Sequence, residues 1–385
     1  MVLANVAFGV GGLFAFHGFN SGIMDDYRTK VIRQQMGNGQ LSRKGYRDSA
    51  LEHPQDEWLT NGDEIAGELT KLPYVEIISP RVRFSALISV TQRDMSLSAF
   101  GEGVDTAREA PFFNALILTA GKRLTDEPDG ILLAKGLADS LKVTAGDPVT
   151  VLAQTPGGAL NGVDAVVTGV FRTGEANFDR SFFRIPLPLA RKLLETNKVE
   201  LLVVGLKDFT QWAAFREEAL RKFPELEAYS FEQIDKVNYE NSVVWLDSQF
   251  QLILFIFLTI ILLGVFNTTS LGVLERTREI GIALSNGEAL RSVVKGLVLE
   301  SFCLGVVGAV AGIAGMFLVN STLLANGILM PPPPGFEGNY YAFLKLEPGP
   351  AVRWALVGVT CAVAAAAFAL RRLKQKSIVE MLAHA

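Results

Sequence analysis

Cysteine and histidine are scarce in this chain of 385 residues, and their scarcity excludes several kinds of site. The two cysteines, Cys303 and Cys361, lie in apolar runs, which is typical of packed thiols rather than of a disulfide or a metal pair. The three histidines, His17, His53 and His384, lie far apart in the sequence and form no local zinc motif. The long polar region contains no cysteine, so its own apolar core must hold it together.

Motifs for nucleotide and acyl chemistry are also missing. No G-x-x-x-x-G-K-[ST] loop occurs, so we expect that the chain does not hydrolyse ATP by itself. The glycine-rich GEGVD beginning at Gly101 lacks the lysine that would reach phosphates, and no G-x-S-x-G elbow is present. The formal net charge of −4 argues against a nucleic-acid partner. The sequence therefore predicts neither an enzyme nor a nucleic-acid-binding protein, with no cofactor or metal of its own.

Basic residues are absent from the start of the chain. Val2–Phe19 is apolar and contains Gly9, Gly11, Gly12 and Gly18, but no lysine or arginine precedes Tyr27. A signal peptide needs a basic segment before its apolar part and a small-residue cleavage site, and FNSG is a poor one. We therefore predict an uncleaved membrane helix over residues 1–24.

Long apolar runs account for the mean hydropathy of +0.28. Besides residues 1–24, they occupy 250–273, 293–320 and 351–370. Each has roughly the 20 residues that a bilayer-spanning helix needs. The predicted fold class is an α+β membrane protein with four transmembrane helices. A large extracytoplasmic α/β domain, residues 25–247, is inserted between the first helix and the second.

Lysine and arginine are distributed unevenly between the loops, and this predicts the orientation. The outer loop at 321–350 has only Lys345. The two inner segments carry eight basic residues: Arg276, Arg278, Arg291, Lys295, Arg371, Arg372, Lys374 and Lys376. Because basic loops stay in the cytoplasm, we expect the amino terminus, the middle loop and the tail at 371–385 inside. The large domain would then lie outside a bacterial inner membrane.

The charged segment 275–290, and above all Glu275–Gly287, lies between the second and third apolar runs. It is rich in helix formers, and Asn286-Gly287 is a plausible stop because glycine takes the left-handed conformation that ends helices. Its apolar residues are Ile280, Ile282, Ala283 and Leu284, whereas Glu275, Arg276, Arg278 and Glu279 are expected to face water or a partner. We predict a short amphipathic helix on the cytoplasmic side.

These residues carry a family resemblance. ERTREIGIALSNGEALRSVVKGLVLES, from Glu275 to Ser301, resembles the cytoplasmic loop of the MacB/FtsX-like ABC transporter permeases, which include the lipoprotein-releasing permeases. SPRVRFSALIS from Ser79, ILLAKGLADSLKVTAGDPVTVL from Ile131 and the ending SIVEMLAHA resemble other parts of that family. The resemblance implies a dimer of permease subunits, identical or related, and a separate ATPase that binds ATP and Mg. It also implies that the middle loop docks on the ATPase through Glu275, Arg276, Arg278, Glu279, Ile280, Gly281, Leu284 and Gly287.

Within the large domain we predict an α/β core split between residues 38–100 and 199–230, a β-rich insert at about 110–190 and a stalk at 232–249. Helices are expected at Asp63–Leu72, Leu132–Leu141 and Phe209–Phe223, the last because its apolar residues recur at helical spacing. Strands are expected at Tyr74–Val90, after a turn at 145–147, at Val163–Phe171 and at Leu201–Gly205.

Two features of the third apolar run call for an interpretation. Gly308 and Gly312 form a G-x-x-x-G pair that lets another backbone approach closely, either within the chain or across a dimer seam. Glu300 is an ionisable residue in a membrane helix and hence a functional candidate. We favour a position near the inner interface or a pair with a neighbouring helix over a role with substrate or protons.

Three functions remain open at this stage. The family resemblance favours mechanotransmission, in which ATP-driven movement at the coupling helix acts outside the membrane on a lipoprotein, a hydrophobic compound or a periplasmic adaptor. The large two-part domain and the prolines at 331–334 favour this interpretation. The alternatives are an FtsX-like scaffold that activates cell-wall hydrolases without transport, and a membrane-anchored receptor without an ATPase.

Overall fold

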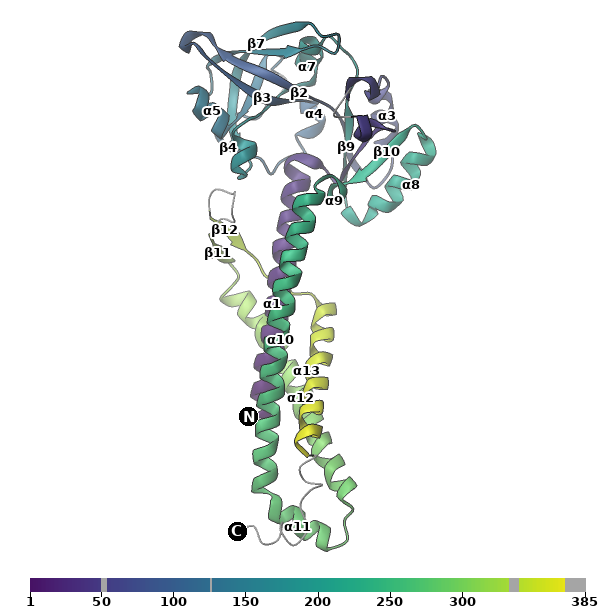
Figure 1. The fold of residues 1–385 in the computed structure, drawn as a ribbon, viewed down its shortest axis with the longest axis vertical. Coiled ribbons are helices and arrows are strands. Elements are labelled where there is room, and N and C mark those ends of the chain that lie inside the picture. Colours follow the sequence, from purple (N-terminus) through teal and green to yellow (C-terminus); the bar gives the residue numbers. More distant parts are fainter. Residues whose placement is uncertain (50–53, 125–126, 332–338, 371–385) are drawn as a thin grey trace. The chain divides into compact units, whose positions relative to one another are not determined.

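The computed structural model describes residues 1–49, 54–124, 127–331 and 339–370, which form two compact units (Figure 1). Among the described residues, the helical unit comprises Met1–Asp25, Asn241–Met330 and 340–370. The α/β unit comprises the described residues of Asp26–Glu240 together with Pro331 and Asn339. The tail at 371–385 and the prolines at 332–334, for which we made predictions, lie outside the described residues.

Four helices in the described part of the chain are long and apolar enough to cross a membrane, at residues 2–36, 239–275, 290–322 and 348–370. The elements involved are α1 (Val2–Val31) with a π-helical turn (Ile32–Met36), α10 (Lys236–Glu275), α12 (Leu290–Thr322) and α13 (Pro348–Leu370). The short helix α11 (Thr277–Ser285) joins α10 to α12, and the hairpin β11 (Ile328–Met330) and β12 (Tyr340–Ala342) precedes α13. All four predicted apolar runs lie within these helices.

Helix α1 is the most enclosed of the four. In its most apolar stretch 44% of the residues are buried, against 11% in α10. Its glycines explain this, because a Cβ added at Gly9 would lie 2.2 Å from Ile261 of α10, and one at Gly12 would lie 2.3 Å from Phe257. On another side, a Cβ at Gly358 of α13 would lie 2.1 Å from Val10. The glycine-rich composition of residues 2–19 thus allows close packing of helices around α1.

The α/β unit contains ten strands and several short helices in its described residues. The strands are β1 (Gly39–Arg43), β2 (Val75–Val90), β3 (Met95–Val104), β4 (Ile117–Gly121), β5 (Gly130–Ala134), β6 (Pro148–Gln154), β7 (Leu160–Arg172), β8 (Phe182–Pro186), β9 (Leu201–Leu206) and β10 (Leu226–Ser230). The helices are α2 (Tyr46–Ser49), α3 (Gly62–Leu69), α4 (Thr106–Glu109), α5 (Lys135–Leu141), α6 (Ala176–Asp179), α7 (Leu187–Leu194), α8 (Trp212–Lys222) and α9 (Phe231–Ile234), with single 3₁₀ turns at 54–57, 91–93 and 209–211.

One part of the unit is a four-stranded antiparallel sheet in the order β10-β1-β9-β2. Every residue of β9 is buried, which explains why Leu201–Leu206 reads as a continuous apolar run. Leu202 and Val204 pack in the main core with α3 and α8, whereas Leu201 and Val203 pack with Ile32 at the end of α1. The sheet therefore lies between helices on both faces.

The other part is a closed barrel, because strand pairing runs from β2 through β3, β8, β5, β7 and β6 and back to β2. Strand β2 is 16 residues long and belongs to both parts: Val75–Arg81 pairs with β9, and Arg81–Val90 pairs with β3. Glycines in β3 make room for the interior, since a Cβ at Gly101 would lie 2.3 Å from Phe183. The glycine-rich GEGVD segment is thus a barrel strand.

The helix predicted over Leu132–Leu141 is wrong in its first turn. Leu132 to Ala134 end strand β5, and the helix begins at Lys135. Strand β5 lies between β7 and β8, with Ile131 and Leu133 in the main core and Leu132 in a second apolar cluster. A strand buried on both faces shows no alternation, so its apolar run could not be told from a buried helix.

Some other local predictions for this unit are confirmed, whereas the helix predicted at Asp63–Leu72 ends at Leu69. The amphipathic helix at 209–223 is present as a 3₁₀ turn and α8, with Phe215 and Ala219 buried. The strand after the turn at 145–147 is β6, and Gly146 has φ +98°. Pro80 lies inside β2, opposite Leu202.

Candidate functional site

Helix α11 has a buried face and an exposed face. Thr277, Ile280 and Gly281 are buried, and Leu284 is half-buried. Ile280 packs in a cluster with Leu370 at the end of α13 and with apolar residues at the start of α12. Arg278, Glu279, Ile282 and Ser285 are exposed, and their spacing of three and four residues puts them on the opposite side of the helix. One face therefore fixes the helix, and the other remains open to solvent or to a partner.

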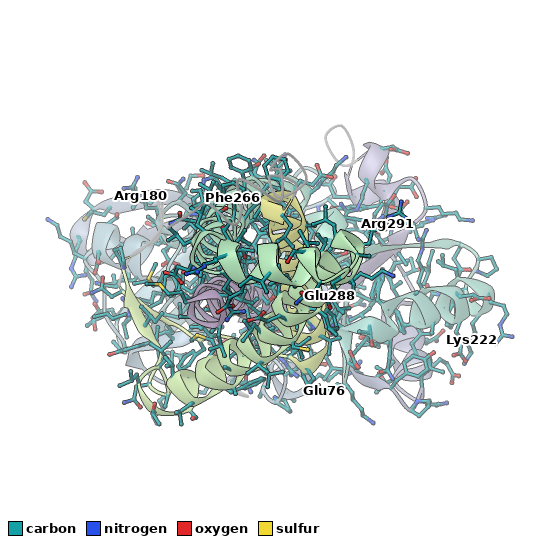
Figure 2. All side chains as sticks on the ribbon, turned by 90° about the horizontal axis from the view of Figure 1, so that it is seen from below. Glu76, Arg180, Lys222, Phe266, Glu288 and Arg291 are labelled. Carbon is teal, nitrogen blue, oxygen red and sulfur yellow. The ribbon has the colours of Figure 1, made fainter. Side chains whose placement is uncertain are left out.

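The carboxyl end of α11 is closed by the predicted stop. Gly287 has φ +94°, and its amide donates to the carbonyl of Leu284 at 3.1 Å. The next amide, that of Glu288, donates to the carbonyl of Ala283 at 3.1 Å. These two hydrogen bonds form a Schellman motif, which requires a left-handed residue and therefore favours glycine at position 287. Two charged residues labelled in Figure 2 follow this stop: Glu288 directly after Gly287, and Arg291 as the second residue of α12.

Two of the predicted residues connect α11 to its neighbours. Glu275 is the last residue of α10 and is exposed, and Arg276 lies in the single-residue bend between the two helices. The guanidinium of Arg276 lies 3.5 Å from the carboxylate of Glu300 on α12, and the two side chains are 56% and 49% exposed. We expected Glu300 to lie near the inner interface or to pair with a neighbouring helix, and the structure pairs it with Arg276 in the bend between α10 and α11.

Ile282 is the residue whose position the sequence did not reveal. We had grouped it with Ile280, Ala283 and Leu284 as apolar, but it is 46% exposed beside Arg278 and Glu279. Helical spacing was the missed signal, because Ile282 follows Arg278 by four residues and Glu279 by three. An exposed isoleucine between charged side chains gives this face an apolar centre.

Gly308 and Gly312 face α1. A Cβ added at Gly308 would lie 2.9 Å from the carbonyl oxygen of Leu3, and one at Gly312 would lie 2.3 Å from that of Ala7. Side chains at these positions would therefore collide with backbone. Gly315, on the same helix, has nothing within 4 Å of such a Cβ. Of our two interpretations of the G-x-x-x-G pair, the structure displays close packing within the chain.

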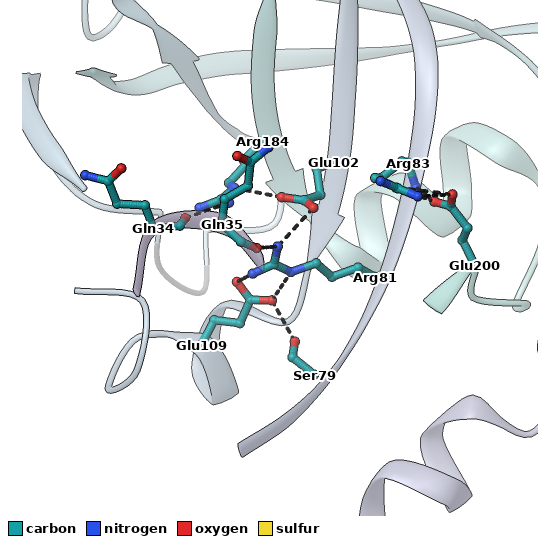
Figure 3. Close-up of polar contacts among 9 residues, drawn as sticks. All are labelled: Gln34, Gln35, Ser79, Arg81, Arg83, Glu102, Glu109, Arg184 and Glu200. Atoms are coloured by element: carbon teal, nitrogen blue, oxygen red, sulfur yellow. Dashed lines mark hydrogen bonds and ion pairs between the residues drawn. The ribbon is translucent and has the colours of Figure 1, made fainter. Parts of the chain in front are cut away.

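A second polar constellation lies at the end of α1, in the α/β unit (Figure 3). The guanidinium of Arg81 forms two hydrogen bonds with Glu109, at 2.6 and 2.8 Å, and one with Glu102 at 3.0 Å. Arg184 donates to the other oxygen of Glu102 at 2.9 Å. These four side chains, which we call the charge cluster, are between 1% and 6% exposed.

The charge cluster also holds the last turn of α1. Arg81 donates to the carbonyl of Gln35 at 2.6 Å, and Arg184 donates to the carbonyl of Gln34 at 3.1 Å. The last carbonyls of a helix lack partners within the helix and carry partial negative charge, so arginines are suitable partners for them. The cluster itself is neutral, because two arginines face two glutamates.

Electrostatics favour the charged forms of Glu102 and Arg81, whereas burial lowers the pKa of the Arg184 guanidinium. Burial disfavours charge on Glu102, but Arg81 and Arg184 outweigh this and lower the pKa of its carboxyl below the ordinary value. Burial likewise opposes the charge on Arg81, but Glu102 and Glu109 outweigh it and raise its pKa. A neighbouring pair, Arg83 with Glu200 at 2.8 Å, lies next along β2. None of the hydrogen bonds found for Arg83 reaches α1.

Our sequence interpretation did not single out the charge cluster. Its signal is weak but present, since Arg81, Glu102 and Arg184 are charged residues that each lie between two buried neighbours in a strand. Strand register explains how they meet, because Glu102 of β3 lies directly opposite Arg184 of β8, and Arg81 lies two residues before Arg83, the residue of β2 opposite Glu102. Opposite charges at facing positions stabilise neighbouring strands. The register itself could not be derived from one sequence.

Comparison with known families identifies both parts of the chain. Residues 2–222 match the MacB-like periplasmic core domain, and residues 252–378 match the FtsX-like permease C-terminal domain. These matches lie on permease domains, and neither includes an ATPase domain.

Individual curated relatives match a smaller part of the chain than the family models do. The chain is 38% identical over 66 residues to the pyoverdine export ATP-binding/permease protein PvdT of Pseudomonas fluorescens, and equally to that of Pseudomonas syringae pv. tomato. The match takes in 17% of this chain and spans only 10% of the length of these curated relatives.

Among solved structures, the periplasmic region of MacB from Actinobacillus actinomycetemcomitans is 16% identical, with a TM-score of 0.40 over 56% of this chain and 96% of that one. The extracellular domain of the noncanonic ABC-type transporter YknZ from Gram-positive bacteria is also 16% identical, with a TM-score of 0.37 over 50% of this chain and 99% of that one.

The family match covers more than half of the chain, and the helices and the α/β unit lie where it requires them. The domain between the first and second spans is therefore extracytoplasmic, and the protein crosses the membrane several times. This chain belongs to the MacB/FtsX-like permease family.

Proposed function

We propose that this permease couples ATP hydrolysis on a separate ATPase subunit to a conformational change outside the membrane, and that α11 is the contact. The observation that carries this is the exposed face of α11, where the charged side chains of Arg278 and Glu279 flank the exposed apolar side chain of Ile282. An apolar anchor with a charged rim is the usual composition of a protein–protein contact. ATP and Mg would be bound by the partner, and this chain would supply no cofactor site.

A second copy of the chain, or a related permease, would complete the membrane part. On α10, Ile256, Ile260, Leu263, Asn267 and Leu274 are exposed and follow one another at intervals of four, three, four and seven residues. This is the spacing of a helix–helix seam. A carboxamide both donates and accepts, so Asn267 could pair with its own copy across a two-fold axis, whereas lipid offers it no partner.

The cargo follows from the family only as a class. A lipoprotein or a hydrophobic compound, handed to a periplasmic adaptor, fits a permease whose described spans hold little polar lining and whose large domain lies outside. An FtsX-like scaffold that activates cell-wall hydrolases remains the second candidate. The large domain, with a barrel added to its sheet, favours transport.

Purification of the tagged chain from native membranes, followed by mass spectrometry, tests the proposal. We expect an ABC ATPase to co-purify and an Ile282→Asp variant to lose it. Arg291→Asp, just beyond the stop of α11, is the matched control and should retain it. A complex without any ATPase would instead support a membrane-anchored receptor, and a co-purifying hydrolase would support the scaffold.

Orientation needs its own test. In a background without cysteine, Ser285→Cys on the exposed face of α11 should react with a membrane-impermeant maleimide only after the cells are opened. Ser96→Cys, on an exposed position of β3, should react in spheroplasts. Labelling of the cysteine at 285 in intact spheroplasts would place α11 outside and would contradict the proposed contact.

A further inference from the structure

The end of α1 is held in the α/β unit by two different kinds of contact. Ile32 and Val31 pack in an apolar cluster with Ile77 and Val203 of the four-stranded sheet. The carbonyls of the π-helical turn are instead bound by arginines of the charge cluster. Apolar packing is non-directional, whereas hydrogen bonds weaken steeply when their angle or length changes. The directional contacts therefore fix the rotation and the axial position of the helix end, together with the ion pair of Arg33 with Glu76 of β2, whose atoms lie 3.1 Å apart.

The charge cluster connects α1 to the barrel in particular. Arg81, Glu102 and Arg184 come from β2, β3 and β8, three consecutive strands of the closed barrel. Glu109 comes from α4, which directly follows β3, and Ser79 donates to its carboxylate at 2.7 Å. Each arginine thus bridges a carboxylate of the barrel side and a carbonyl of α1 (Figure 3).

The π-helical turn gives this contact its geometry. Two consecutive carbonyls, those of Gln34 and Gln35, bind two different arginines, and Gly37 with φ +66° ends the helix directly afterwards. Gln34 is fixed a second time, because its side-chain amide donates to the carbonyl of Ala115 at 3.2 Å. Single π turns inside α-helices frequently mark functional positions.

We propose that the charge cluster is the joint through which a displacement of α1 moves the barrel, with Arg81 and Arg184 as positioning residues. The proposal rests on the proposed function, since it names the element that would pass ATP-driven movement from the membrane helix to the outer domain. Without the joint, α1 would still be packed against the sheet but could turn or slide relative to the barrel.

A distance measurement within the α/β unit tests the joint. Spin labels at Thr29→Cys on α1 and Ser96→Cys on β3, both exposed, report the position of the helix relative to the barrel. The native Cys303 and Cys361 would be replaced by alanine in the full-length chain, reconstituted in nanodiscs with its co-purified ATPase. In the unaltered joint we expect a narrow distance distribution that does not change when ATP and Mg are added.

Arg184→Met removes the contact to Gln34 but leaves Glu102 paired with Arg81. We expect the distribution to become roughly twice as wide, because a helix end without its partners opens locally, and to shift with nucleotide. Arg83→Met is the matched control, since it breaks an arginine–glutamate pair on β2, the strand of Arg81, but no contact with α1. It should keep the narrow distribution even where it lowers the melting temperature.

If Arg184→Met fails to fold, the double variant Arg184→Met/Glu102→Gln removes one charge of each sign and leaves Arg81 paired with Glu109. Equal, narrow distributions in this variant and in Arg83→Met would overturn the joint and leave the cluster with a role in stability alone. Should no ATPase co-purify, the proposed function fails, and the width measured without nucleotide still decides whether the cluster is a joint.

Discussion

The charge cluster and helix α11 are the two places where charge gathers around a helix end, and they are built in opposite ways. In the cluster, Arg81 and Glu109 are 2.6 Å apart with side chains that are 1% and 6% exposed. Beside α11, Arg276 and Glu300 are 3.5 Å apart and about half exposed. The charges of Arg81 and Glu109 are paired inside the chain and shielded from solvent. The side chains of Arg276 and Glu300 remain about half exposed to solvent.

This difference indicates different roles. A buried pair with several hydrogen bonds fixes one geometry, because each charge would be left without a partner in any other. A long, exposed pair contributes little to stability and is easily exchanged for another partner. We therefore interpret the cluster as a permanent internal contact and the surface of α11 as one that becomes complete only on binding.

Measurements of the free energy of unfolding should distinguish the charge cluster most clearly from the surface of α11. Arg81→Met leaves Glu109 buried without its cation, and we expect it to lower the free energy of unfolding by about 3–5 kcal/mol. Arg276→Met removes a half-exposed pair and should cost only about 0–1 kcal/mol. Thermal unfolding of the purified chain in one detergent gives both values. Similar losses in the two variants would abolish the contrast between them.

Packing around α1 gives the next largest effect. Gly312→Leu would force a side chain against the Ala7 carbonyl, and we expect a loss of about 1–3 kcal/mol as helices α1 and α12 separate. Gly315→Leu on the same helix meets open space and should change stability little. The melting temperatures of the two variants, measured side by side, check this. Equal values would mean that close approach at Gly312 does not hold the helices together.

A substitution on the exposed face of α11 should change ATPase stimulation rather than the stability of the chain. Glu279→Lys reverses a charge on its exposed face, and we expect ATPase stimulation to fall by about tenfold, the equivalent of about 1.4 kcal/mol of lost contact energy. Its melting temperature should not change. Glu288→Lys lies just past α11 and takes part in the Schellman motif only through its backbone amide, so it is the control of equal charge and should keep its activity. Full stimulation in Glu279→Lys would remove this residue from the proposed contact.

The sequence predicted the elements that depend on local patterns and missed those that depend on register. The four spans, the stop at Gly287 and helix α8 each follow from composition or spacing within one segment. The charge cluster unites, by strand pairing, residues that lie up to 103 positions apart, namely Arg81 and Arg184. Likewise, Leu132–Ala134 could be recognised as a strand only once its neighbours β7 and β8 were known.

The smallest expected effect is the change in the free energy of unfolding at acidic pH, which tests the charge of Glu102 in the cluster. Because the folded-state pKa of Glu102 lies below its ordinary value, its charge stabilises the fold at every pH above about 4.3, the unfolded value. That contribution is lost as the pH falls from there through the folded-state pKa, since protonation releases Arg81 and Arg184. We therefore expect the free energy of unfolding to decline below about pH 4.

Glu102→Gln should reduce that decline, because an amide in this position cannot take up the proton, although the variant is less stable at neutral pH. Gly315→Leu, which changes no charge, should keep the wild-type slope. Unfolding curves at a series of pH values give the slope of the free energy of unfolding against pH for each variant. This slope, rather than the free energy at one pH, reports whether Glu102 is ionised in the folded state. An unchanged slope in Glu102→Gln would mean that the cluster is not held together by the charge of this carboxylate, and the contrast with the exposed pair beside α11 would then rest on burial alone.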